Sequence, residues 1–128
     1  MKARKRESLA RGVALFNRQE FYAAHAAWEA GWADELAEDR LLLQGLIQVA
    51  AAFYKLQIGE PRGAVTLLEQ ARTRLKAVRM SALGVDLTAL LPEVEAWRLE
   101  AQRLAEEEHA TYDPARLPKL TYTPPVTH

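Results

Sequence analysis

The 128-residue chain has no cysteine, no net charge and no apolar run that approaches the length of a membrane span. Without cysteine, disulfides and thiolate metal sites are excluded. The 17 basic and 17 acidic residues cancel, so net charge provides no attraction to nucleic acid or membranes. The basic start, MKARKRES, is not followed by the apolar stretch of a secretory signal. We therefore expect a cytoplasmic protein that binds neither nucleic acid nor membranes.

With 49% hydrophobic residues, a chain of this length can bury the core of one domain. Its apolar residues recur every three or four positions, which is typical of helices with one buried face. Pro92 falls inside the last apolar pattern and predicts either a kink or a short helix followed by a longer one. We predict an all-α bundle of about five helices in residues 1–110, with helices near 7–16, 20–32, 40–58, 61–78 and 86–109.

Residues 111–128 are rich in proline, with prolines at 114, 118, 124 and 125. Proline cannot continue a helix, so we expect an extended tail that packs on the bundle or leaves it. Leu117, Leu120 and Tyr122 are the side chains that would lie on the bundle. Two aspartates are candidate helix N-caps, Asp39 and Asp86.

The chain contains a weak internal repeat. Glu20, Ala24 and Trp28 match Glu60, Ala64 and Leu68 at a constant offset. Each half consists of a helix, a tight turn and a second helix, in the manner of tetratricopeptide repeats. This pattern predicts a bundle built from antiparallel helical hairpins.

Polar residues interrupt the most apolar part of the chain. If helix 20–32 folds back on helix 40–58, Trp28 faces Gly45 and Trp32 faces Leu41. The missing side chain of Gly45 would then leave room for the Trp28 ring. In the same arrangement four polar groups meet between the two helices: His25, Glu29, Gln44 and Gln48.

This polar cluster has two interpretations. Buried polar groups must pair, and glutamine amides can both donate and accept, so the cluster could be a structural network that fixes helix register. Alternatively it is a hydrolase-like site, with Glu29 as general base and His25 as acid, base or ligand. A third possibility is that an exposed apolar patch, Trp32 with Trp97 or the tail, binds another copy or a protein partner. We take a structural or partner-binding domain as the leading interpretation and leave open whether the protein is an enzyme.

A metal site is the weaker alternative. Catalytic zinc needs three protein ligands, whereas only His25, Glu29 and Glu20 lie close together in the sequence. His109 and His128 are far along the chain. We therefore expect no cofactor.

Two segments resemble a known family: LFNRQEFYAAHAAWEAGW and RLLLQGLIQVAAAFYKLQIGEPRGA, with GVDLTALL more loosely. They are similar to the small all-helical domain of unknown function number 309, over roughly residues 10–90. The resemblance implies an all-α fold, and some family members are labelled predicted metal-dependent hydrolases. This chain departs from the family pattern at Ala23, Ala26 and Lys55, where members carry acidic residues or histidine. The positions that carry over are His25, Trp28, Glu29, Trp32, Arg40, Gln44, Gly45 and Gln48, and we add Lys55 to the candidate binding residues.

Overall fold

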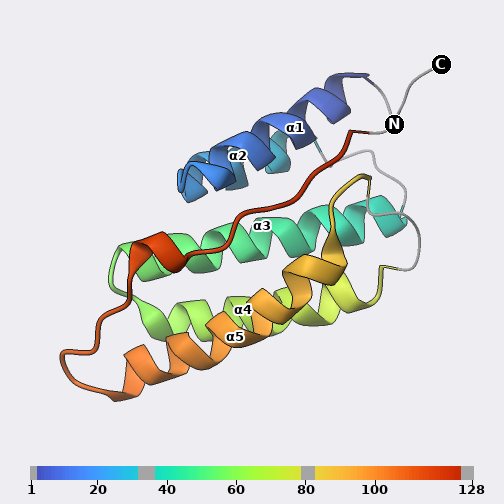
Figure 1. The fold of residues 1–128 in the computed structure, drawn as a ribbon. Helices are drawn as coiled ribbons and strands as arrows, with labels where there is room; N and C mark the ends of the chain where they lie inside the picture. The colour runs from blue at the N-terminus through green and yellow to red at the C-terminus, as the bar shows by residue number, and fades with distance from the viewer. Residues whose placement is uncertain (1–2, 32–36, 79–82, 125–128) are drawn as a thin grey trace.

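The computed structural model describes residues 3–31, 37–78 and 83–124. The predicted all-α class is confirmed, because within these ranges the regular elements are all helical (Figure 1). They are α1 (Ala3–Asn17), α2 (Phe21–Gly31), α3 (Ala37–Gln57), α4 (Pro61–Lys76), α5 (Leu87–Glu106) and the short 3-10 helix η1 (Pro114–Arg116). None of the described helices has the length and apolar character that crossing a membrane requires.

Helices that follow one another in the sequence pack side by side, from α1 to α5 (Figure 1). Contacts show that neighbouring helices run in opposite directions. Gln57 Nε2, at the end of α3, donates to the carbonyl of Gln19, just before α2, at 3.0 Å. The start of α3 meets the end of α4, where a Cβ on Gly45 would lie 2.5 Å from Leu75 Cδ2. In the same way, Phe16 near the end of α1 meets Phe21 at the start of α2, with ring centroids 4.9 Å apart. The described hairpins are therefore antiparallel.

Helix ends follow the expected chemistry in two places. The side chain of Asp86 accepts a hydrogen bond of 3.0 Å from the Ala89 N–H and caps α5, as predicted. Gly59 takes a left-handed φ of 76° between α3 and α4, and Pro61 opens α4.

Other boundaries differ from the prediction. Asp39 lies inside α3, so the prediction that it caps this helix is wrong. The helix begins earlier because 37–39 contains no residue that breaks a helix. Pro92 does not divide α5, so two separate helices are not formed. The carbonyl of Thr88, which loses its helical donor, sits at an exposed position where solvent can hydrate it.

After α5 the tail runs back along the bundle (Figure 1). Buried side chains and hydrogen bonds hold it there. Leu117 and Leu120 are buried against the core. The side-chain amide of Asn17 pairs with the Leu120 backbone through two hydrogen bonds, as a peptide group in a sheet would. Its Nδ2 donates to the Leu120 carbonyl at 3.0 Å, and the Leu120 N–H donates to Asn17 Oδ1 at 2.7 Å. Nearby, the Thr123 N–H donates to the Gly84 carbonyl at 2.8 Å. The tail thus connects the end of α1 to the start of α5.

Candidate functional site

Trp28 is a core residue. Its side chain is 1% exposed, and its Nε1 donates to the Leu9 carbonyl at 3.1 Å. The indole lies over Gly12 of α1, where a Cβ would be 2.0 Å from Trp28 Nε1. Gly12, not Gly45, makes room for this ring, so the predicted pairing of Trp28 with Gly45 is wrong. Because α1 packs closely on α2, the neighbour of Trp28 lies on α1 and not on α3.

Gln48 belongs to the side of α3 that meets α4. Its Nε2 donates to Gln70 Oε1 at 3.0 Å, and its Oε1 accepts from Arg74 Nη1 at 3.0 Å. Both ends of the amide are therefore used on α4 and not on His25. The predicted pairing of His25 with Gln48 is therefore wrong. Gln44 lies one turn before Gln48 on α3 and is partly exposed.

His25 and Glu29 do come together, on the edge of α2. His25 Nε2 lies 3.4 Å from Glu29 Oε1, and the side chains are 27% and 55% exposed. The ring of Tyr22 lies next to them, 6.0 Å from the His25 ring centroid and 5.3 Å from that of Tyr54 on α3. The pair thus sits in contact with solvent beside two tyrosines, rather than inside the bundle.

These residues share one face of the molecule, which we call the open face. On α3 its members are spaced by four, three, four and three residues, so they form one stripe, and none of them is buried. Contacts between Tyr22 and Tyr54 place α2 on one side of this stripe, and contacts of Gln48 place α4 on the other. The open face comprises Tyr22, His25 and Glu29 of α2, Gln44, Gln48, Ala51, Lys55 and Ile58 on and just beyond α3, and Gln70 and Arg74 of α4.

Lys55, Arg40 and Trp32 were also predicted as binding residues. Lys55 pairs with Glu60 in the turn before α4, with Nζ 2.7 Å from Oε2. Arg40 is exposed near the start of α3. Trp32 lies outside the described residues. Within the described ranges, histidines and carboxylates do not gather in threes at metal-binding distance.

A separate hollow of about 440 Å³ lies between α5 and the tail. Trp97 and Tyr112 line it, with ring centroids 5.7 Å apart, together with Glu100 and Arg103. Burial raises the pKa of the Tyr112 hydroxyl. The hydrogen bond from Arg103 lowers the pKa of Glu100, and Arg103 also donates to the Thr111 carbonyl at 2.8 Å. Sequence reasoning missed this hollow because its far wall is the tail, whose path has no periodic signal.

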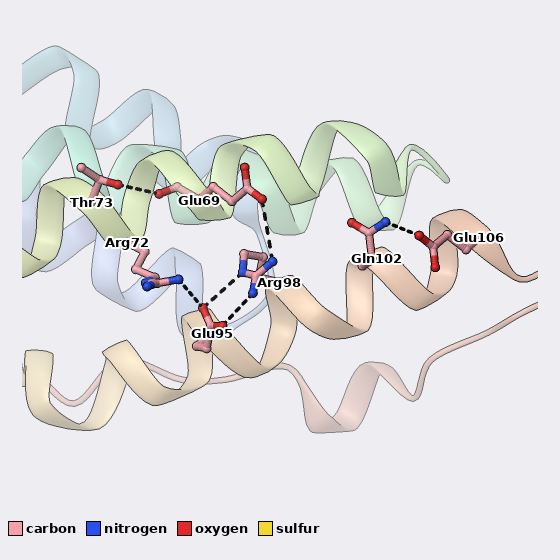
Figure 2. Close-up of polar contacts among 7 residues, drawn as sticks. All are labelled: Glu69, Arg72, Thr73, Glu95, Arg98, Gln102 and Glu106. Carbon is pink, nitrogen blue, oxygen red and sulfur yellow. Dashed lines mark hydrogen bonds and ion pairs between the residues drawn. The ribbon is translucent and has the colours of Figure 1, made fainter.

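Ion pairs join α4 to α5 (Figure 2). Glu95 lies between Arg72 and Arg98, with its Oε2 3.0 Å from Arg72 Nη1 and its Oε1 2.7 Å from Arg98 Nη2. Arg98 also approaches Glu69 at 3.7 Å. Hydrogen bonding from Arg98 lowers the pKa of Glu95, while that bond raises the pKa of Arg98. Each of these charges is paired with an opposite charge of the same cluster. The cluster therefore connects two helices and is not a candidate ligand site.

Comparison with known protein families gives a match. The sequence model of a domain of unknown function, DUF309, matches residues 9–67. The matched segment runs from α1 into α4 and contains His25, Glu29, Gln44 and Gln48. No curated protein matches the chain.

Proposed function

We propose that this chain, whose residues 9–67 match a domain of unknown function, is a partner-binding module. The open face is its binding surface. The core residues of the domain, such as Trp28, hold the helices in place. The polar residues of the open face contact the partner with the donors and acceptors that their contacts within the face leave available.

The observation that carries this proposal is the exposed ring of Tyr22, which packs on the partly buried Tyr54 beside the open face. Tyr22 is 62% exposed although its ring packs on Tyr54 at 5.3 Å. Tyrosine combines a large apolar body with a polar tip, which is why it is enriched in protein interfaces. Ile58, at the end of the same face, is 47% exposed. Amides, a histidine and charged groups surround these side chains, as at the polar rim of an interface.

Site-specific photocrosslinking tests the proposal. A benzophenone amino acid in place of Tyr22 would report a partner at the open face, and the same amino acid in place of Leu99 is the matched control. Leu99 is 57% exposed on α5, so it is equally accessible but lies off the open face. We expect an adduct of one defined mass from position 22 and none from position 99. Equal labelling at both positions, or no adduct at either, would overturn the proposal.

The hydrolase-like alternative keeps one supporting observation, the 3.4 Å approach of His25 Nε2 to Glu29 Oε1 in a solvent-accessible position. Two groups fall short of the three protein ligands of a catalytic zinc site. Titration calorimetry with Zn²⁺ on the parent protein and on His25→Ala separates the cases. Loss of a stoichiometric binding step in the variant supports the alternative, whereas two identical titrations dismiss it.

A further inference from the structure

Glu29 and Arg74 lie at the same height on opposite sides of α3. Tyr22 is level with Tyr54, and Glu29 is seven residues, or about two turns, further along α2. Because α2 runs antiparallel to α3, Glu29 is level with the turn of α3 near Ile47. On the other side, Arg74 bonds Gln48 in that same region. The open face therefore carries a negative group on its α2 edge and a positive group directly across on its α4 edge.

We propose that the partner at the open face is a second copy of this chain, related by a two-fold axis that runs parallel to α3. This inference rests on the proposed function and names the partner. Such an axis exchanges the two edges of the face but keeps every residue at its height. Glu29 then meets Arg74 of the partner subunit, and Arg74 meets Glu29 of the partner subunit. The dimer gains two identical ion pairs from a single complementary arrangement.

The other groups of the open face fit the same axis. His25 is one turn from Glu29, and Gln70 is one turn from Arg74, so an imidazole meets an amide that can donate or accept. At the centre, α3 lies on its own copy. Ala51 allows the two helices to approach closely there, and the amide of Gln44 is self-complementary. The Lys55 ammonium, which would meet its own copy, is already paired with Glu60 at 2.7 Å.

Charge selects this axis over the other simple choice. A two-fold axis in the same plane but perpendicular to α3 would place α2 on α2 and α4 on α4. Glu29 and Arg74 would then each lie opposite an edge that lacks the opposite charge. The balanced composition, with a net charge of zero, adds no long-range repulsion between copies.

Charge reversal tests the inference by sedimentation equilibrium of the full chain. We expect a concentration-dependent dimer for the parent protein. Glu29→Arg and Arg74→Glu should each raise the dimer dissociation constant at least about tenfold, because like charges then face each other twice. The double variant, with the charges exchanged, should return to within about threefold of the parent, since both pairs are restored with reversed sign.

Controls keep this test decisive. Glu93→Arg makes the same charge change at an exposed position of α5 and should leave the dissociation constant unchanged. Circular dichroism checks that each variant is folded, and Glu29→Arg alone carries the test if Arg74→Glu unfolds after losing its bond to Gln48. A monomeric parent, or unaltered dimers in the single variants, overturns the inference. A photo-adduct at position 22 with a mass other than that of two chains would do so too, while leaving the partner-binding proposal in place.

Discussion

The contact between α1 and α2 and the contact between α4 and α5 are held by different interactions. Rings fill the first: Phe16 lies 4.9 Å from Phe21 and 6.1 Å from Trp28, centroid to centroid. Ion pairs cross the second, where Glu95 binds Arg72 and Arg98 (Figure 2). Ring packing depends on buried area and shape, whereas partly exposed ion pairs depend on pH and salt. Two hairpins of one small bundle should therefore respond to different perturbations.

The largest effect is expected from Trp28→Ala. The substitution removes a fully buried indole and its hydrogen bond to the Leu9 carbonyl, and it leaves a cavity over Gly12. The free energy of unfolding should fall by about 3–5 kcal/mol. Urea denaturation followed by far-UV circular dichroism measures this change.

Tyr22→Ala is the matched control, since it removes an aromatic ring from the same helix at a position that is 62% exposed. Its cost should stay within about 0.5 kcal/mol, as is usual for surface positions. Similar losses at the two positions would mean that the ring contacts between α1 and α2 are not what stabilises this hairpin.

The two regions also show what the sequence can predict. The bundle was predictable because apolar residues repeat with the helical period, and because Asp86, Gly59 and Pro61 are strong local signals for helix ends. These features depend on residues close together in the chain. They required no knowledge of how distant helices meet.

The candidate site was predicted less well because it depends on which helices pack together. The prediction paired α2 with α3 alone. It therefore placed Gly45 against Trp28 and Gln48 against His25. In the structure, Gly12 of α1 takes the first role and Gln70 and Arg74 of α4 take the second. The role of Asn17 was also invisible, because its partner Leu120 is far along the chain. Helical spacing gives the face on which a residue lies but not the neighbour that it meets.

Glu95→Gln should have a smaller effect on the stability of the protein, and this effect should be limited to acid pH. Arg98 lowers the pKa of Glu95 in the folded protein, so folding favours its charged form. Its stabilisation is fully present above the ordinary pKa of 4.5 and is lost as pH falls through the lowered value. The parent should lose stability over this range more steeply than the variant. Urea denaturation at a series of pH values below neutrality compares the two slopes.

Glu93→Gln, the same change at an exposed position on α5, provides the comparison for Glu95→Gln. Its stability should follow that of the parent over the whole acid range. Added salt should reduce the difference in unfolding free energy between the parent and Glu95→Gln, because the ions screen a partly exposed ion pair. If Glu93→Gln flattened the pH dependence equally, the acid sensitivity would belong to general charge and not to the α4–α5 ion pairs.

The smallest effect is expected from His25→Ala. A histidine inside a buried network would leave unpaired partners when removed, at a cost of about 1–3 kcal/mol for each unsatisfied group. His25 is instead partly exposed, and its charged neighbour is Glu29 at 3.4 Å. We expect a change within about 0.5 kcal/mol in urea denaturation at neutral pH. Phe21→Ala, one turn earlier on the buried side of α2, should cost about 3–5 kcal/mol under the same conditions. If His25→Ala lowered the free energy of unfolding as much as Phe21→Ala does, His25 would be a core residue and not a member of the open face. A side chain that supports the core is not available to a partner.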